Sequence, residues 1–210
     1  MTKTTSGNKI LFIGDSITDC FRRDKFPPLG NGYVLFFDDL IKINNPELKL
    51  TIINKGISGN TIIDLKERWE DDVIFHKPDK LSVLIGINDL HRYVRGEEIY
   101  SPEHYYKNYY SLLELTVKKL DSDILLMSPF YISKANTLDT FRKKVLSLIP
   151  SYISKVEKLS EEFSTMYINL HEVFQKRIEL VEPETFAPEP VHPNRTGHLL
   201  IALEVYKKLI

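Results

Sequence analysis

The stretch Lys9-Ile-Leu-Phe-Ile-Gly-Asp-Ser-Ile-Thr-Asp19 decides the predicted fold. Its four consecutive apolar residues, at positions 10–13, predict a strand buried on both faces, as the strands of a parallel sheet are. A Gly-Asp pair ends this run, and an amphipathic pattern begins directly after it. The sequence therefore predicts that Ser16 lies where a strand turns into a helix. A serine in that position is presented to solvent, beside the unpaired backbone N–H groups of a helix N-terminus.

Further apolar runs predict more strands, and segments of helical period alternate with them. The predicted strands span residues 9–13, 48–53, 81–85, 124–127 and 166–168. Apolar residues spaced by three and four predict helices with one buried stripe, from Ile62 to Val73 and over residues 141–163, where Pro150 is expected to cause a kink. Residues 197–210 predict a last helix. Because parallel strands need right-handed crossovers, we expect a three-layer α/β/α, flavodoxin-like sheet of five strands in the order 2-1-3-4-5.

Length, charge and cysteine usage exclude several classes of protein. The chain has 210 residues, which predicts a single domain over 1–210. Its 28 basic and 29 acidic residues are interspersed, which disfavours a nucleic-acid partner. No apolar run reaches the ~18 residues that a membrane helix needs, and no signal peptide is visible. The single cysteine, Cys20, cannot form an internal disulfide, which agrees with a reducing compartment. Together these features predict a soluble cytoplasmic protein. The apolar termini permit a homo-oligomer.

Polar loops follow the first three predicted strands, and in such a sheet they should meet at one rim, where ligands bind. In the second loop, Gly59 allows a backbone N–H to approach a reacting oxygen without an intervening Cβ. In the third, Asn88 offers a neutral amide donor. With the N–H of Ser16, these groups predict a three-donor oxyanion hole. The plainer interpretations are a helix N-cap for Ser16, a turn for Gly59 and a loop residue for Asn88.

The segment Glu189-Pro-Val-His192 lies between a proline-rich loop and the last predicted helix. A serine hydroxyl needs a general base at neutral pH, and histidine, with a pKa near ~6.5, is the usual one. We therefore predict Ser16 as the nucleophile and His192 as its base. Glu189, three residues earlier, is expected to accept a hydrogen bond from the other imidazole nitrogen and to fix its tautomer.

Other groups are weaker candidates for chemistry. The remaining histidines lack the spacing of a zinc site, so we expect no metal and no cofactor, and we expect His198 to pack or cap within the last helix. Asp15 is expected to bond to loop backbone rather than to serve as a third acid, and Asp19 and Asp89 likewise. A catalytic Cys20 is disfavoured, because a small half-buried cysteine is the commoner case. A non-catalytic, flavodoxin-like module that binds a phosphate or flavin is the alternative of a different class.

Four ordered blocks, Gly14–Asp19, Gly59, Gly86–Asp89 and His192-Pro193, resemble those of the GDSL, or SGNH, esterases and acylhydrolases. Residues 11–20, 54–61, 64–69 and 129–132 are most similar to the bacterial xylan acetylesterase branch. The resemblance implies a cofactor-free serine esterase that removes acetyl groups from a small carbohydrate, such as acetylated xylo-oligosaccharides, through an acyl-serine. It also implies the same roles for the nucleophile, the base and the oxyanion donors. A thioesterase or lysophospholipase is the alternative within the family.

The chain departs from the family pattern at one position of the predicted triad. Where the family usually has aspartate three residues before the histidine, this chain has Glu189. The extra methylene requires the carboxylate to fold back, while the prolines on either side limit how far the loop adjusts. If Glu189 does not reach, Glu182, Glu184 or a backbone carbonyl is left to hold the imidazole.

Aromatic and basic side chains near the predicted rim are candidates for sugar contacts. Arg68 and Arg92 are candidates for hydrogen bonds to hydroxyls, whereas the helical stripe predicts core packing for Trp69. The aromatic candidates for stacking are Phe26, Tyr33, Trp69, Tyr93 and Tyr131.

Overall fold

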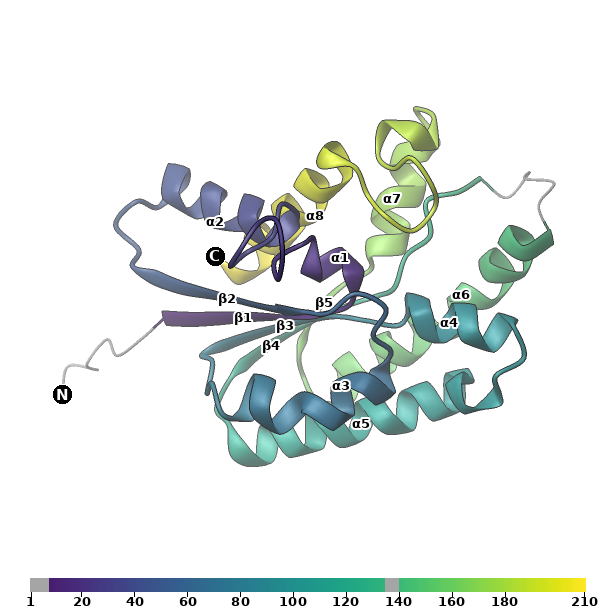
Figure 1. Cartoon of the computed structure of the whole chain (residues 1–210). Coiled ribbons are helices and arrows are strands. Elements are labelled where there is room, and N and C mark those ends of the chain that lie inside the picture. The colour runs from purple at the N-terminus through teal and green to yellow at the C-terminus, as the bar shows by residue number, and fades with distance from the viewer. Residues whose placement is uncertain (1–7, 135–139) are drawn as a thin grey trace.

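The computed structural model describes residues 8–134 and 140–210, and its centre is a parallel sheet of five strands (Figure 1). The strand order is β2-β1-β3-β4-β5, which confirms the predicted order. The strands are β1 (Asn8–Gly14), β2 (Leu50–Gly56), β3 (Lys80–Leu84), β4 (Asp123–Met127) and β5 (Met166–Ile168). The second strand starts and ends later than its apolar run, because residues 54–56 continue the pairing with β1 as far as Gly14 opposite Gly56.

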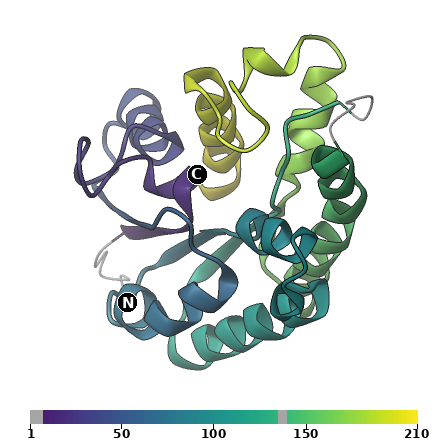
Figure 2. The ribbon, with the colours of Figure 1, turned by 45° about the vertical axis from the view of Figure 1, so that its right-hand side comes forward.

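Helices cover both faces of the sheet, as predicted for three layers (Figures 1 and 2). One face carries α1 (Ser16–Asp19), α2 (Tyr33–Asn44), α7 (Leu170–Ile178) and α8 (Arg195–Leu209). The other carries α3 (Ile62–Trp69), α5 (Pro102–Lys119) and α6 (Thr140–Glu162), with α4 (Ile87–Val94) against α6. Short 3₁₀ turns lie at Glu98–Tyr100 and Pro183–Thr185.

Aromatic side chains fill the core between the sheet and the two helical layers. Phe12 of β1 packs edge to face on Phe37 and Tyr33 of α2, with ring centroids 5.1 Å and 5.8 Å apart. Trp69 is buried, and its indole N–H donates to Thr116 Oγ1 at 2.9 Å, which confirms its predicted core role. Tyr33 and Tyr131 are also buried, so the suggestion that they stack on sugars is wrong.

Two helices differ from their predicted course. The stripe that begins at Ile62 continues to a buried Val73, but the α-helix ends at Trp69 and the chain goes on as a π-helix over Glu70–Ile74. The last helix begins two residues earlier than predicted because Asn194 caps it, accepting from the N–H groups of Thr196 and Gly197. The side-chain cap, which lies before the first apolar residue, fixes where this helix starts.

No helix within the described residues is long and apolar enough to cross a membrane. The kink at Pro150, the single domain over 1–210, the homo-oligomer and the cytoplasmic location stay predictions from the sequence. The loops that follow β1, β2 and β3 lie at the carboxyl ends of three adjacent strands, which is where the predicted oxyanion donors are found.

Candidate active site

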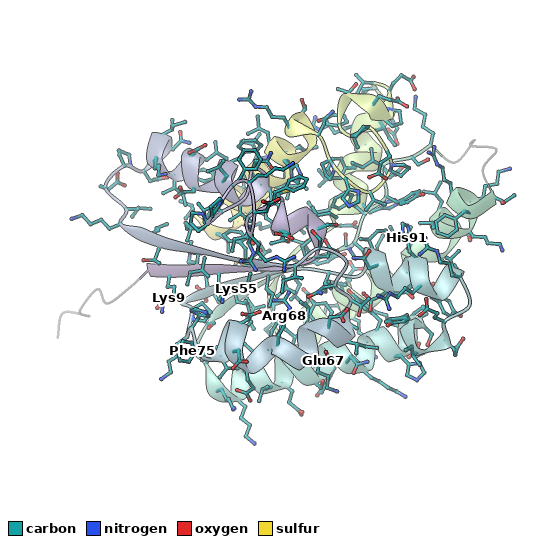
Figure 3. The ribbon with its side chains drawn as sticks, in the orientation of Figure 1. Lys9, Lys55, Glu67, Arg68, Phe75 and His91 are labelled. Carbon is teal, nitrogen blue, oxygen red and sulfur yellow. The ribbon has the colours of Figure 1, made fainter. Side chains whose placement is uncertain are left out.

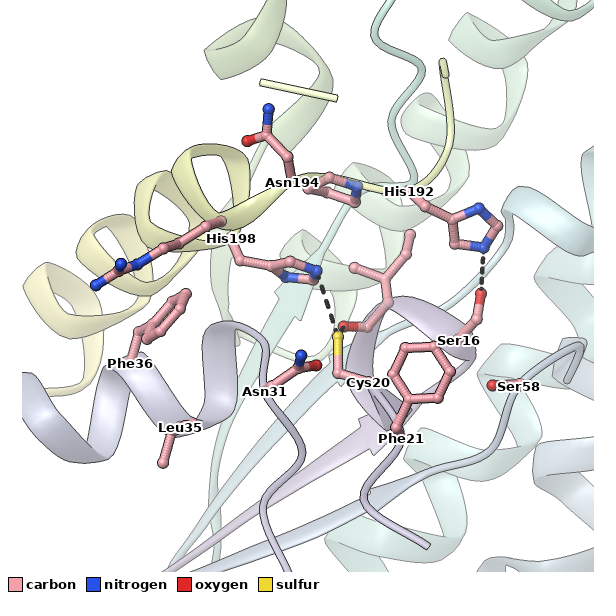
Figure 4. Close-up of a pocket in the computed structure, with 13 residues that line it drawn as sticks. Ser16, Cys20, Phe21, Asn31, Leu35, Phe36, Ser58, His192, Asn194 and His198 are labelled. Carbon is pink, nitrogen blue, oxygen red and sulfur yellow. Dashed lines mark hydrogen bonds between the residues drawn. The ribbon is translucent and has the colours of Figure 1, made fainter. Parts of the chain in front are cut away.

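Ser16 is the first residue of α1, directly beyond the end of β1. The N-cap of this short helix is Asp15, whose Oδ1 accepts the N–H of Ile17 at 3.0 Å. The interpretation of Ser16 as the N-cap is therefore wrong, because the preceding aspartate performs that role. The Ser16 hydroxyl instead lies 2.9 Å from Nε2 of His192 (Figure 4).

Glu189 reaches the other nitrogen of the same imidazole. Its Oε1 lies 2.5 Å from His192 Nδ1 and accepts the His192 backbone N–H at 2.7 Å. Its Oε2 accepts the N–H of Val191 at 2.9 Å. The carboxylate is thus folded back over its own turn, which accommodates the extra methylene of glutamate. Glu182, one of the alternatives, instead forms an ion pair with Lys134.

Glu189 and His192 each stabilise the charged form of the other. Burial raises the pKa of Glu189, but the hydrogen bonds from the His192 ring and from the backbone N–H groups of Val191 and His192 outweigh it, so the pKa lies at about 2. The hydrogen bond with this carboxylate raises the pKa of His192 above its ordinary value, against an opposing effect of burial. A hydroxyl, an imidazole and an ionised carboxylate in this order are suited to nucleophilic acyl transfer.

The predicted oxyanion donors lie on segments that are bonded to one another. The N–H groups of Ser16 and Gly59 make no hydrogen bond to any residue in 8–134 or 140–210. Gly59 has a φ of +82° and open space where a Cβ would be, so its backbone conformation, rather than crowding, requires glycine. Asn88 donates one amide N–H to the Asn60 carbonyl at 3.0 Å, which leaves its second N–H to bind another acceptor.

Arg68 of α3 ties these segments together from beneath (Figure 3). Its guanidinium donates to the carbonyl of Gly14 at 3.2 Å and to Oδ1 of Asn60 at 2.8 Å. It also donates to the Lys55 carbonyl at 2.8 Å and pairs with Asp72 at 2.5 Å. These bonds occupy the Arg68 guanidinium, so Arg68 positions the segments around the site and does not bind a substrate. Sequence reasoning missed this role, since its partners are spread over nearly 60 residues of chain.

Comparison with known proteins identifies the family. The model of the GDSL-like lipase/acylhydrolase family matches residues 12–200. The chain belongs to this family. It is 39% identical over 210 residues to an acetylxylan esterase of Geobacillus stearothermophilus, covering 95% of this chain and 93% of the relative.

Solved structures of this GDSL family show the same SGNH hydrolase fold. The crystal structure of Axe2, an acetylxylan esterase from Geobacillus stearothermophilus, has a TM-score of 0.83 and 36% identity, with 98% of this chain and 95% of Axe2 covered. A putative GDSL-like lipase from Parabacteroides merdae has a TM-score of 0.86 and 32% identity, with 97% and 98% covered. The chain is a carboxylic ester hydrolase, so the alternative of a non-catalytic binding module is wrong.

Two aspartates of the GDSL blocks are buried beside the site without reaching His192. Burial raises the pKa of both Asp15 and Asp89 to about 7. Both oxygens of Asp89 lie within 3.2 Å of the Ile62 N–H, at the start of α3. The two carboxyls therefore bond to backbone, as predicted. Asp19 Oδ2 likewise accepts hydrogen bonds from the backbone N–H of Ser58 at 3.0 Å and from the Ser58 hydroxyl at 2.7 Å.

His198 and Cys20 contact each other near Ser16 and form a neutral pair (Figure 4). His198 Nδ1 accepts the Tyr33 N–H at 3.3 Å, so its Nε2 carries the hydrogen and donates to Cys20 Sγ at 3.3 Å. Burial lowers the pKa of His198 to about 4 and raises that of the Cys20 thiol to about 12. The predicted packing role of His198 is confirmed, and a protonated thiol is unsuited to nucleophilic attack.

A cavity of about 740 Å³ opens beside the Ser16 hydroxyl (Figure 4). Ser16 and His192 line it together with residues that sequence reasoning did not select, notably Phe21, Asn31 and Phe36. The proposed rim aromatics Phe26 and Tyr93 do not line it. The sequence places Phe21 near the site, because it follows Ser16 by five residues, but the outward direction of its ring depends on backbone angles that no pattern indicates. No group of three or more His, Cys, Asp or Glu side chains in the described ranges could hold a metal ion.

Proposed function

We propose that this esterase removes acetyl groups from the hydroxyls of a small carbohydrate, such as acetylated xylo-oligosaccharides, through an acetyl-serine intermediate. The observation that carries the proposal is the chain of contacts from Ser16 Oγ to His192 Nε2 and from His192 Nδ1 to Glu189. The choice of an acetyl group and a xylose-based alcohol rests on the similarity to the acetylxylan esterase of Geobacillus stearothermophilus.

In the first half of the reaction, Ser16 Oγ attacks the acetyl carbonyl carbon while His192 Nε2 takes its proton. The oxyanion of the tetrahedral intermediate accepts hydrogen bonds from the N–H groups of Ser16 and Gly59 and from the Asn88 amide. Glu189 stabilises the imidazolium that has formed. The bond to the sugar oxygen then breaks, His192 returns its proton to that oxygen, and the deacetylated sugar leaves.

In the second half, water replaces the sugar. His192 takes a proton from the water as its oxygen attacks the acetyl-serine carbonyl, and the same donors hold the second oxyanion. Collapse of this intermediate breaks the bond to Ser16 Oγ, which regains a proton from His192, and acetate leaves. Each donor and the base thus act twice without any cofactor.

Catalytic mutants of Axe2 support the roles proposed for this chain. In three solved structures of that relative, a serine, an aspartate and a histidine are each replaced by alanine. The replaced aspartate and histidine are three positions apart, which is the spacing of Glu189 and His192. Glutamate in the place of aspartate is therefore the main chemical difference between the two sets.

The test is acetate release from acetylated xylobiose, together with hydrolysis of p-nitrophenyl acetate, butyrate and octanoate. We expect wild-type rates to fall with acyl length, and Ser16→Ala to lower kcat by about 10⁴-fold or more on every substrate. Ser147→Ala, which removes an exposed hydroxyl on α6, is the matched control and should leave all rates unchanged. Preference for octanoate would favour a thioesterase or lysophospholipase, and equal rates for Ser16→Ala and wild type would overturn the proposal.

A further inference from the structure

Most residues that line the cavity lie on one side of Ser16, although Ser58, the neighbour of Gly59, also lines it. Figure 4 shows Phe21 and Asn31 between Ser16 at one end and Phe36 of α2 at the other. Neither Gly59 nor Asn88 lines this cavity. An ester bound with its carbonyl oxygen at those donors would therefore extend one of its two arms, the acyl group or the alcohol, into the cavity.

Phe21 is held in an unusual backbone conformation that presents its ring to this space. Cys20 and Phe21 have φ angles of 41° and 61°, so two consecutive non-glycine residues are left-handed. A bulky residue in that region is rare, and such strain concentrates at functional sites. Phe21 lines the cavity and is 56% exposed, and Lys25 Nζ lies over its ring, 5.5 Å from the centroid.

The loop that carries this ring is anchored at several points. Arg22 Nε donates to the Gly56 carbonyl at 2.7 Å, and the Asn31 N–H donates to the Cys20 carbonyl at 3.0 Å. The side chain of Asn54 donates to the Leu29 carbonyl at 2.7 Å. Because both ends and the middle of the loop are bonded, the ring is part of a preformed surface.

Two polar side chains of the cavity wall are available to a ligand. The Asn31 amide and the Arg195 guanidinium are exposed, and neither makes a hydrogen bond within residues 8–134 and 140–210. Asn194, by contrast, uses its side chain to cap α8. The rest of the wall is mainly apolar, with Ile17, Leu35 and Phe36 beside Phe21. An alkyl chain that also covered Asn31 and Arg195 would displace water from them without replacing its hydrogen bonds, which is unfavourable. A pyranose offers an apolar face to a ring and hydroxyls at its edge.

We propose that the cavity is the subsite for the sugar, the alcohol side of the ester, with Phe21 as a stacking platform and Asn31 and Arg195 as donors to its hydroxyls. The acetyl group then lies on the opposite side of Ser16, toward Gly59 and Asn88. This inference rests on the proposed function for the identity of the sugar. It assigns binding to a residue that follows the nucleophile by five positions.

The experiment compares acetylated xylobiose with vinyl acetate, whose leaving group is too small to contact both Phe21 and the polar wall. Phe21→Ala should lower the ratio of kcat/KM for acetylated xylobiose to that for vinyl acetate by about fivefold to tenfold, mainly through KM. Phe21→Trp should keep the ratio within about threefold of wild type. Phe75→Ala is the matched control, because Phe75 is exposed but lies beyond α3 and outside the cavity, and it should leave the ratio unchanged (Figure 3).

The outcomes separate this subsite from the function on which it rests. Suppose that wild type releases acetate from acetylated xylobiose in a Ser16-dependent way, but that Phe21→Ala leaves the ratio of the two kcat/KM values unchanged. This result would overturn the subsite alone. With vinyl octanoate as a third substrate, a loss in Phe21→Ala confined to that ester would also overturn it, by placing the acyl chain in the cavity. Wild type that turns over vinyl acetate but not acetylated xylobiose would overturn the proposed function. Circular dichroism of each variant checks that the fold is intact.

Discussion

The two sides of the candidate triad are built in different ways. Ser16 owes its position to bonds between segments far apart in the chain, such as Arg68 to the Gly14 carbonyl and Asn54 to the Thr18 carbonyl at 2.7 Å. His192 and Glu189 are held mainly by bonds within their own four-residue turn, with side chains 56% and 44% exposed. The position of Ser16 therefore depends on the packing of the sheet, whereas the positions of Glu189 and His192 depend mainly on their own turn.

This difference separates the effects expected from mutation. On the base side, a substitution changes the charge and the pKa of His192 with little effect on the rest of the fold. On the nucleophile side, a substitution shifts atoms that must hold the transition state, so it should change kcat rather than substrate binding.

Glu189→Gln should have the largest effect. Loss of the carboxylate removes the partner that fixes the tautomer and stabilises the imidazolium, and kcat should fall by about 10³-fold or more. In the proposed mechanism the neutral imidazole is the base, so we expect activity to rise with pH through the pKa of His192. The hydrogen bond with Glu189 raises that pKa, so in Glu189→Gln the rising limb should move to lower pH. The measurement is kcat/KM against pH for both proteins.

Glu189→Asp is the conservative control for this prediction. The shorter side chain keeps the charge and matches the residue usual in the family, so activity should stay within about tenfold of wild type. The rising limb of the pH profile should stay near its original pH. If Glu189→Gln kept an activity within about twofold of wild type and its pH profile did not shift, Glu189 would not belong to the triad.

Asn88→Ala should have the next largest effect. Removing one oxyanion donor typically lowers kcat by about 10²-fold to 10³-fold while KM changes little. Steady-state kinetics on p-nitrophenyl acetate measures both constants. Asn44→Ala, which removes an exposed amide on α2, is the control and should change neither. An effect of Asn88→Ala on KM alone would argue against a role in the oxyanion hole.

Arg68→Met should have a smaller effect on the same side. The loss of bonds to Gly14 and Asn60 loosens the nucleophile loop and the Gly59 loop, and a misplacement of about 1 Å can cost about 10²-fold. We expect kcat to fall by about 10-fold to 100-fold with KM nearly constant. Lys66→Met, on the exposed face of the same helix, is the control. A folded Arg68→Met protein with unchanged kcat would contradict the positioning role.

The sequence predicted the features that local patterns determine. Short apolar runs marked the strands, and a strand followed by Gly-Asp-Ser located Ser16 at the rim. The three-residue spacing of Glu189 and His192 was enough to place the two side chains together, because both belong to one turn. The end of β2 was not predictable in this way, since pairing with β1, rather than hydrophobicity, sets it.

Other features depend on atoms that no local pattern relates. Asp15, rather than Ser16, caps α1, although both residue types are good N-caps and stand next to each other. The outward direction of Phe21 follows from two left-handed residues that are not glycine. The bonds of Arg68 join residues 14, 55, 60 and 72, which become neighbours only when the sheet and α3 have packed.

The most direct test of the central claim, that Ser16 is a nucleophile activated by His192, is covalent labelling with diethyl p-nitrophenyl phosphate followed by peptide mass spectrometry. We expect one diethylphosphoryl group on the peptide that contains Ser16, with esterase activity lost in proportion, and no such labelling in Ser16→Ala or His192→Ala. Complete inactivation with Ser16 unmodified, or a label on another residue in an enzyme that stays active, would contradict it.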